Sequence, residues 1–370
     1  MTSSPRHLWI LLSVLVPGGL LGQAGTLVGR SGAYIESYSF GSGLAFRRIT
    51  EFTIPLSVTQ RLGDRLVLDF ATAYASATVR QAIGSGTIEH SGLVDTDLRA
   101  TFAAIPGRLV FNLVGTIPTG ATAVPDTSIP LFGATATDLL GFTTPSFGSG
   151  GGISGGFAYA ARLSTDWAIG AGASYRQGAS YSPLQGRNLT LTPGGEFRGR
   201  IGLEGPFGGG KYFRGALVYT TTAENSLSDT SHSSIGDRVL AYAAVSLPAG
   251  TSHLSVYGWD MRRLRARNWT LPLAVPRGNV LALGVRLERP LNPNTTLGPL
   301  VEFRHELTGP GPSMQLLGYL IRGGTDLRYR LSDHATGVVQ AQYAFGSLRV
   351  FTSNVSVTGP RLGAVIEWSQ

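Results

Sequence analysis

The sequence contains no cysteine among its 370 residues, and Lys211 is the single lysine among 30 basic residues. The absence of cysteine excludes a disulfide scaffold, thiol catalysis and cysteine-ligated metals. Charged residues make up only 14% of the chain, compared with roughly 25% in soluble domains. A low charged fraction is expected of a protein whose outer surface does not face water everywhere.

The net charge of +8 comes from arginines that are spread along the chain and mixed with acidic residues. A protein that binds nucleic acid clusters its basic residues on one face, so we do not expect nucleic acid as a partner. The 51 glycines follow no Gly-X-Y period, which excludes collagen. The chain also lacks a repeat of about 20–50 residues, which disfavours propellers and solenoids.

Long apolar runs are missing too, because no stretch after residue 24 is apolar over the length that a membrane-spanning helix needs. At the beginning of the chain, Arg6 and His7 precede a short apolar run and then small residues up to Ala24. This order predicts a secretory signal peptide over residues 1–24, cleaved after Ala24. The exported chain, residues 25–370, is then expected in the periplasm, outside the cell or in the outer membrane.

The stretch 93–102, LVDTDLRATF, separates into two sets when every second residue is read. Side chains alternate between the two faces of a β-strand, so an apolar set that includes Val94, Leu98 and Phe102 lies opposite Asp95, Asp97 and Arg99. We expect the apolar set to face lipid and the charged set to face a lumen. Similar alternation recurs in about sixteen segments. Fourteen is the alternative, because segments 32–40 and 252–261 alternate weakly.

The connections between these segments alternate in length. Short turns are expected near residues 61–64, 105–107, 164–166, 205–211, 248–251, 290–295 and 332–335. Longer loops are expected near residues 80–91, 118–150, 178–194, 223–235, 262–278 and 347–358. This arrangement is typical of outer-membrane barrels. The sequence therefore predicts an all-β fold, a transmembrane antiparallel β-barrel of about 16 strands (14 the alternative), over residues 25–370 in the cell outer membrane.

A soluble β-sandwich would carry more charge and more lysine than this chain. The positions of the aromatic residues also favour a barrel. Aromatic girdles are expected where the wall crosses the membrane surfaces, and the alternation places aromatic residues outward near both ends: Phe102, Trp167, Phe213, Tyr329 and Trp368 at the turn end, and Tyr74, Tyr175, Tyr219, Tyr343 and Phe345 at the loop end. The strand that ends near Trp368 is expected to pair with the first strand, near residues 33–40, and to be recognised by the barrel-assembly machinery. Outer-membrane lipid is the other expected partner.

A barrel of this size has a lumen too wide for side chains alone to fill. The alternation predicts that charged residues line this lumen, and the candidate pore-lining residues are Asp69, Asp95, Asp97, Arg99, Glu196, Arg198, Arg200, Arg286, Glu302, Arg304, Asp326, Arg328 and Arg330. They can brace the wall through arginine–carboxylate pairs or steer solutes. A wall of mixed charge predicts weak ion selectivity.

The loop 118–150 is the longest, and it contains the apolar stretch SIPLFGATATDLLGF. Long loops without regular structure are usually functional or disordered, and an apolar loop at a barrel mouth is expected to fold inward and constrict the pore. Tyr257 and Trp259 are expected to face inward, either as an aromatic contact for an apolar solute or packed against this loop. The residues before the first strand, 25–31, are too few for an N-terminal plug domain.

The residues Gly92 to Leu98, GLVDTDL, are followed by an apolar strand and by Pro118-Thr119-Gly120. This stretch resembles the phenol meta-degradation family of outer-membrane transporters, which is similar in architecture to the fatty-acid and aromatic-hydrocarbon transporter barrels. Val94 stands where the family's Gly-x-Gly-Asp-x-x-Leu pattern has its second glycine, and the resemblance covers roughly residues 90–180. It implies a transporter for small solutes that are hydrophobic or aromatic.

Catalysis is the remaining alternative, because some outer-membrane barrels are hydrolases. A nucleophile needs an adjacent base, and the candidate bases after the signal peptide are His90, His232, His253, His305 and His334. None of these histidines sits in a recognisable nucleophile motif, and no two of them have metal-ligand spacing, so we expect no catalytic residue, no metal and no cofactor. The predicted function is an outer-membrane channel or transporter for small solutes. A structural or adhesive barrel and an outer-membrane hydrolase are the alternatives.

Overall fold

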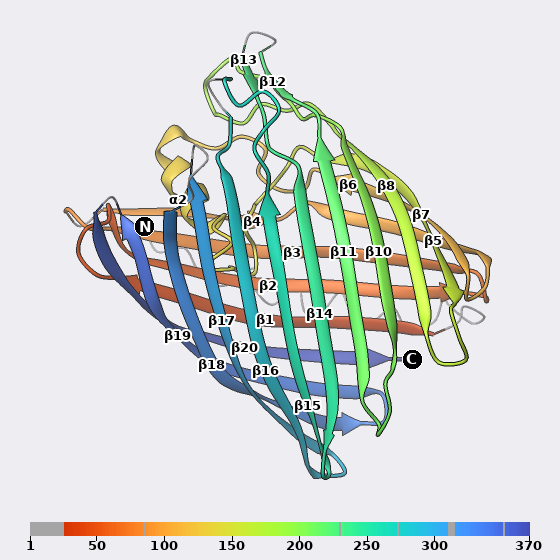
Figure 1. The fold of residues 1–370 in the computed structure, drawn as a ribbon. Coiled ribbons are helices and arrows are strands. Elements are labelled where there is room, and N and C mark those ends of the chain that lie inside the picture. Colours follow the sequence, from red (N-terminus) through yellow and green to blue (C-terminus); the bar gives the residue numbers. More distant parts are fainter. Residues whose placement is uncertain (1–25, 85, 229–230, 272–273, 310–314, 351) are drawn as a thin grey trace.

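The computed structural model describes residues 26–370 except 85, 229–230, 272–273, 310–314 and 351, and the predicted signal peptide lies outside this range. The described chain forms a β-barrel (Figure 1). Its wall strands are β1 (Leu27–Phe40), β2 (Phe46–Leu62), β3 (Leu66–Gln81), β4 (Thr87–Leu93), β5 (Thr96–Ile105), β6 (Leu109–Ile117), β7 (Gly152–Arg162), β8 (Ala168–Gly178), β10 (Glu196–Pro206), β11 (Tyr212–Thr222), β14 (Arg238–Ala249), β15 (Ser252–Arg263), β16 (Arg277–Asn292), β17 (Thr295–Gly309), β18 (Gln315–Ser332), β19 (Ala335–Val350) and β20 (Ser353–Ser369).

Each wall strand pairs antiparallel with its neighbours, and the last strand closes the barrel on the first. The register between β1 and β20 runs from Val28 opposite Ser369 to Phe40 opposite Val357. Strands β4 and β5 both pair with β3: β4 pairs with residues 74–80 and β5 with residues 66–71. Together β4 and β5 therefore occupy one position in a wall of sixteen strands. The predicted count of sixteen and the predicted pairing of the ends are confirmed. Closure leaves no strand edge along this seam, as a membrane-spanning sheet requires.

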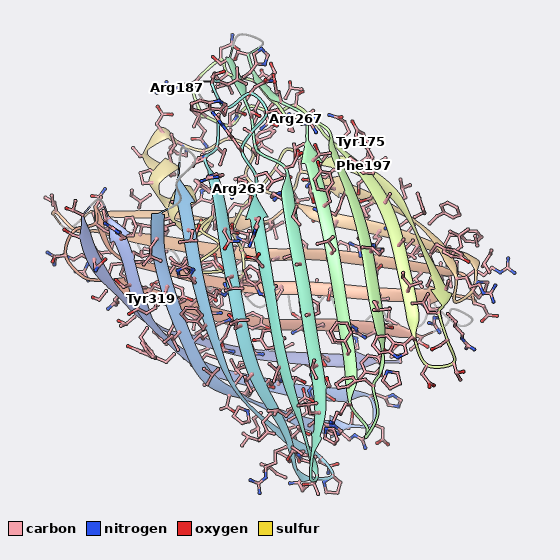
Figure 2. All side chains as sticks on the ribbon, in the orientation of Figure 1. Tyr175, Arg187, Phe197, Arg263, Arg267 and Tyr319 are labelled. Carbon is pink, nitrogen blue, oxygen red and sulfur yellow. The ribbon has the colours of Figure 1, made fainter. Side chains whose placement is uncertain are left out.

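The outer face of the wall is apolar. Outward side chains such as Leu98, Phe157, Val301 and Ile366 are exposed, although exposed surfaces of soluble proteins rarely carry large apolar patches. Predicted girdle residues are among them, and Figure 2 shows Tyr175 together with Phe197 and Tyr319 on the outside of the strands. A closed barrel with an apolar outer face is the outer-membrane architecture, and the protein is an outer-membrane β-barrel.

The strand connections alternate between a turn end and a loop end of the barrel. The turn end holds short connections such as 63–65, 106–108 and 333–334, and the loop end holds the long connection 118–151. A small sheet of β9 (Leu191–Thr192), β12 (Asn225–Leu227) and β13 (Ser231–Ser233) extends the wall beyond the loop end (Figure 1).

Two of the predicted long loops, 80–91 and 347–358, are wrong, because strands occupy most of both ranges. Strand β3 continues to Gln81 and β4 begins at Thr87, while β19 continues to Val350 and β20 begins at Ser353. The inward residues Val355 and Val357 are buried apolar residues. The outward residues there are polar, among them Arg349, Asn354 and Ser356. The apolar set therefore lies inward, and the pattern of apolar lipid-facing residues is reversed although the strand continues.

The wall strand is interrupted within LVDTDLRATF. Tyr74 of β3 lies opposite Leu93, and Ala71 lies opposite Asp97, so the β4–β5 side has one residue more than β3 in this interval. This is the geometry of a β-bulge, which shifts the facing of the residues around it. Val94 therefore packs against the interior hydrophobic cluster, and the prediction that it faces lipid is wrong. Leu98 and Phe102, beyond the bulge, do lie on the outer face.

The helical part of the described chain is small. It consists of the 3-10 helix η2 (Asp126–Ser128) and the α-helix α2 (Ile129–Thr135), both in the connection between β6 and β7. None of the helices in the described ranges is long and apolar enough to cross a membrane.

Candidate solute pathway

The connection between β6 and β7, residues 118–151, folds into the barrel and is called the inner segment below. Its apolar side chains Leu131, Leu139, Leu140, Phe142 and Phe147 are buried. They join one hydrophobic cluster with inward-facing wall residues, namely Tyr38, Phe40, Ile49, Ala75, Ala77, Val79, Leu320, Ala344, Val355 and Val357. The inner segment therefore packs against the wall formed by β1–β3 and β18–β20, as expected for an apolar loop at a barrel mouth.

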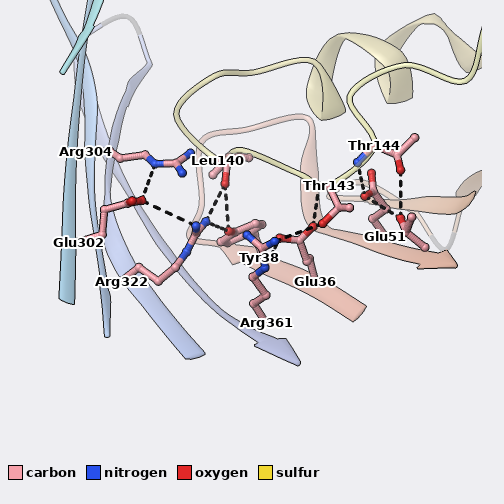
Figure 3. A network of polar contacts seen from close by, with 11 residues as sticks. Glu36, Tyr38, Glu51, Leu140, Thr143, Thr144, Glu302, Arg304, Arg322 and Arg361 are labelled. Atoms are coloured by element: carbon pink, nitrogen blue, oxygen red, sulfur yellow. Dashed lines mark hydrogen bonds and ion pairs between the residues drawn. The ribbon is translucent and has the colours of Figure 1, made fainter. Parts of the chain in front are cut away.

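Two buried carboxylates receive the backbone of the inner segment. The Thr143 N–H donates to Glu36 Oε2 at 2.7 Å, and the Thr144 N–H donates to Glu51 Oε1 at 2.8 Å (Figure 3). Both glutamates are 1% exposed. A buried charge is costly unless it is paired or hydrogen-bonded, and Arg361 Nε lies 3.2 Å from Glu36 Oε1. The arrangement fixes the chain direction of the segment at residues 143–144.

Arginines of β17 and β18 hold the other part of the inner segment. The Arg322 guanidinium donates to the Leu140 carbonyl at 2.9 Å and to the Tyr38 hydroxyl at 2.7 Å. The Tyr38 hydroxyl in turn donates to the same carbonyl at 3.0 Å. Arg304 donates to the Asp138 carbonyl at 3.2 Å, so residues 138–140 contact two wall arginines. Figure 3 shows the contact of Arg322 with Leu140.

Asp95, at the bulge between β4 and β5, binds both ends of the inner segment. Its Oδ1 accepts from the Gly120 N–H at 3.1 Å. Its Oδ2 accepts from the Ser149 N–H at 2.6 Å and from the Ser149 hydroxyl at 2.8 Å. Tyr181 of the next loop packs on Gly150, and burial raises the pKa of its hydroxyl, with Asp95 adding to the effect. Asp95 therefore serves as an anchor for the inner segment rather than as a free charge on the wall.

The inner segment fills only one side of the lumen, as the exposure of the strands demonstrates. On β20 the inward Val355, Val357 and Val365 are buried while their neighbours are exposed. On β10 both faces are exposed, with Arg198 and Arg200 inward and Phe197 outward. Asp97 and Arg99 of β5 are likewise exposed, opposite the outward Leu98. We call the lumen side of β5–β14 the open half.

The inward face of β7 and β8, called the floor of the open half below, consists of small residues. The inward positions of β7 and β8 include Ser154, Gly156, Ala158, Gly170, Gly172 and Ser174. Gly172 leaves room for a neighbouring side chain, because a Cβ atom there would lie 3.1 Å from Arg200 Nε. Long arginine side chains from adjacent strands can therefore lie over this floor without filling it.

The structure brings several predicted pore-lining residues together in ion pairs. Arg304 Nε contacts Glu302 Oε1 at 2.8 Å, Arg286 contacts Asp326 at 2.8 Å, and Glu196 receives Arg198 at 2.9 Å and Arg238 at 2.8 Å. Arg328 lies 3.5 Å from Glu367. These contacts agree with the bracing role that arginine–carboxylate pairs can have in a wall.

Other predicted residues have no ion pair among the described residues. Asp69 accepts from the Thr59 hydroxyl at 2.6 Å, and Asp97 accepts from the Thr116 hydroxyl at 2.6 Å. Arg99, Arg200 and Arg330 lie further than 4.0 Å from any acidic oxygen in the part of the chain that the structure describes. The strand alternation places the arginines Arg99 and Arg200 in the open half and Arg330 at the turn end.

Sequence reasoning missed Glu36, Tyr38 and Glu51. Glu36 and Tyr38 lie in a segment of weak alternation, and Glu51 stands at the beginning of segment 51–60, which otherwise alternates between apolar and neutral residues. A carboxylate on the inward face of an otherwise apolar or neutral strand was the available signal, because such a group must find a donor.

The predicted inward aromatic residues contact wall charges. The Tyr257 hydroxyl donates to Glu302 Oε2 at 3.0 Å, and the Arg304 guanidinium lies 5.8 Å from the centre of the Trp259 ring. Since Arg304 also binds Asp138, these rings support the inner segment through wall side chains.

One sequence pattern that occurs at the nucleophile of hydrolases is present in the wall. A Gly-x-Ser-x-Gly pentapeptide occurs at 152–156, but it lies within the continuous strand β7 rather than at the strand-to-helix turn that a nucleophile elbow requires. Within the described ranges no three histidine, aspartate or glutamate side chains are grouped to hold a metal ion. The absence of catalysis and of a cofactor stays a prediction.

Comparison with known proteins gives no family. No family model matches the sequence, and no curated protein matches it. Among solved structures, a bacterial polysaccharide outer membrane secretin has a TM-score of 0.48 and 8% identity, over 93% of this chain and 97% of that one. Pseudomonas putida OprB has a TM-score of 0.47 and 10% identity, over 94% of each chain.

The outer membrane channel DcaP of Acinetobacter baumannii has a TM-score of 0.46 and 10% identity, over 96% of this chain and 100% of that one. At this level of similarity none of these proteins assigns a solute. The resemblance to the phenol meta-degradation family stays a prediction.

Proposed function

We propose that this protein is an outer-membrane channel through which small solutes diffuse along the open half of the lumen. The observation that carries the proposal is the exposure of both faces of β5 and β10, in contrast to the buried inward face of β20. An inward side chain reached by water borders a space that a small solute can enter. The inner segment would narrow this space and set the size limit.

The lining favours polar solutes over the hydrophobic or aromatic ones that the family resemblance implies. Most inward residues of β5 to β10 are charged, polar or small, with Val110 and Val114 of β6 as apolar exceptions. Tyr257 and Trp259 are engaged by Glu302 and Arg304. The assembly machinery is the proposed partner of the last strand, β20.

Reconstitution into planar bilayers tests the proposal. A channel is expected to give discrete conductance steps, and a structural or adhesive barrel gives none. Absence of conductance in bilayers, together with absence of sugar uptake into loaded liposomes, would overturn the proposal. Incubation with detergent-dispersed phospholipid and a peptide library tests the hydrolase alternative in parallel.

A cross-link then tests whether the solute passes beside a fixed inner segment. The hydroxyls of Thr53 and Thr144 lie 3.2 Å apart, between β2 and the inner segment, and the chain has no cysteine of its own. In a Thr53→Cys, Thr144→Cys variant, a disulfide confirmed by mass spectrometry should leave conductance unchanged. The oxidised single variant Thr53→Cys is the control. Loss of conductance on cross-linking, restored by reductant, would mean that the segment must move.

A further inference from the structure

We propose that the open half of the lumen is an anion-selective pathway that takes small oxyanions, solutes with carboxylate or phosphate groups. The inference rests on the proposed channel function and adds the class of solute. It starts from the distribution of charge in the lumen, whereas the wall of mixed charge expected from the sequence predicts only weak ion selectivity.

On the side of the lumen that the inner segment occupies, the acidic side chains already accept hydrogen bonds or form ion pairs. Glu36 and Glu51 accept backbone N–H groups of the inner segment, and Asp95 accepts three donors from it. Glu302 receives Arg304 and Tyr257, and Asp326 receives Arg286. These carboxylates are buried or paired, so they contribute little negative potential to the remaining space.

The open half carries an excess of arginine. The strand alternation and pairing from β5 to β14 place seven arginines and three acids on the inward face: Arg99, Arg162, Arg176, Arg198, Arg200, Arg214 and Arg238, with Asp97, Glu196 and Glu204. All three acids have donors, because Glu196 binds Arg198 and Arg238, Glu204 binds Arg214 at 2.8 Å, and Asp97 binds Thr116. Asp69 of β3 lies opposite Arg99 in the sheet but makes no ion pair with it, and with Asp69 included the inward arginines still outnumber the acids.

Arg99 and Arg200 are the central members of this set. Both are exposed to the lumen, and neither has an ion pair among the described residues. Arg200 extends over the floor at Gly172. A guanidinium has a fixed fork of donors that matches the two oxygens of a carboxylate or a phosphate. Fixed charges in a confined lumen select ions by sign.

The floor adds a size argument. Serine, glycine and alanine at the inward positions of β7 and β8 leave open space beside the guanidinium groups. A bulky or apolar floor would hold a solute through its hydrocarbon surface, whereas this floor offers mainly backbone and hydroxyl groups. A small hydrated oxyanion fits these contacts better than an apolar ring.

Reversal potentials in a KCl gradient across a planar bilayer test the sign of the selectivity. The wild-type channel is expected to pass chloride in preference to potassium. In an Arg99→Gln, Arg200→Gln variant the chloride-to-potassium permeability ratio should fall about threefold, because two unpaired charges are lost from a screened lumen. Neither substitution leaves a carboxylate without its partner, so the barrel should assemble normally.

The matched control is Arg80→Gln, Arg349→Gln. Both arginines are exposed on the outward face near the loop end, so the net charge changes equally while the lumen does not. The control should keep the wild-type ratio. A cation preference of the wild type, or an equal change in both double variants, would overturn the inference while leaving the channel function in place. No conductance at all would instead refute the channel function itself.

Added oxyanions then test recognition. Succinate and inorganic phosphate are each expected to reduce the chloride current of the wild type, and to reduce it less in the Arg99→Gln, Arg200→Gln variant. Comparison of the two indicates which oxyanion the lumen favours. A reduction no larger than that caused by glycerol, for both ions, would contradict oxyanion binding.

Discussion

Replacement of Asp95 by asparagine is the most direct perturbation of the inner segment. Asparagine keeps one acceptor oxygen for the Gly120 N–H, but its NH₂ group replaces the oxygen that accepts from Ser149. The Ser149 hydroxyl can rotate to accept from the new NH₂, whereas the Ser149 N–H loses its acceptor. A hydrogen bond to a charged group contributes about 1.5–3 kcal/mol, and an unsatisfied buried donor costs about 1–3 kcal/mol. We therefore expect the anchor to weaken by about 2–4 kcal/mol, or about 30- to 1000-fold in local opening.

Amide hydrogen exchange of the detergent-solubilised barrel measures this opening, because exchange reports local unfolding free energies. Protection should fall most near Gly120 and Ser149 and less around α2. Asp97→Asn is the matched control, since Asp97 lies two residues further on and contacts Thr116 instead of the inner segment. Equal exchange of the inner segment in wild type and Asp95→Asn would refute the anchoring role. Equal loss of protection in both variants would indicate a general effect on the wall.

Four further substitutions have distinct expected outcomes. Gly120→Ala should expose the inner segment to protease, because a Cβ atom there would lie 1.9 Å from the Phe147 carbonyl oxygen. Its control is Gly133→Ala in α2, where a Cβ atom meets no atom within 4 Å and should stabilise the helix by about 0.5–1 kcal/mol. Equal protease sensitivity of the two variants would contradict the close approach at Gly120. Tyr38→Phe should cost only about 1 kcal/mol in thermal unfolding, because Arg322 still binds the Leu140 carbonyl, and a loss several times larger would mean that the hydroxyl organises the whole network. Gly29→Val should impair closure of the barrel, seen as loss of the fast-migrating unheated form on electrophoresis, because a Cβ atom at Gly29 would lie 2.0 Å from the Trp368 ring; normal migration would contradict this seam geometry.

The sequence predicted the barrel well because lipid imposes a simple rule on it. Outward residues such as Leu98, Val301 and Ile366 must be apolar wherever the wall meets hydrocarbon, so the period of two persists over most of the wall. The rule fails at the loop end, where outward residues such as Arg349 and Asn354 are polar and the inward residues are apolar. This is the case at Val355 and Val357, where the inner segment replaces water on the inward side, and a strand was mistaken for a loop.

The inner segment was predicted to fold inward, but its anchors were not identified. Periodicity assigns a residue to a face and says nothing of its partner. Asp95 and Asp97 have the same place in the alternating pattern, yet the bulge directs Asp95 to the inner segment and leaves Asp97 on the wall. A bulge depends on the register between two strands, and a single strand's sequence does not contain that register.

The free energies of the two kinds of contact indicate which of them keeps the inner segment in the barrel and which of them sets its position. Its five buried apolar side chains each gain about 1.5–3 kcal/mol from burial, while a typical hydrogen bond adds about 1 kcal/mol net, because lumen water would otherwise bind the same groups. Apolar packing against β1–β3 and β18–β20 therefore keeps the segment inside the barrel, and the carboxylates determine where its ends lie. The same carboxylates would otherwise face the lumen, so the anchoring of the segment also removes negative charge from the pathway.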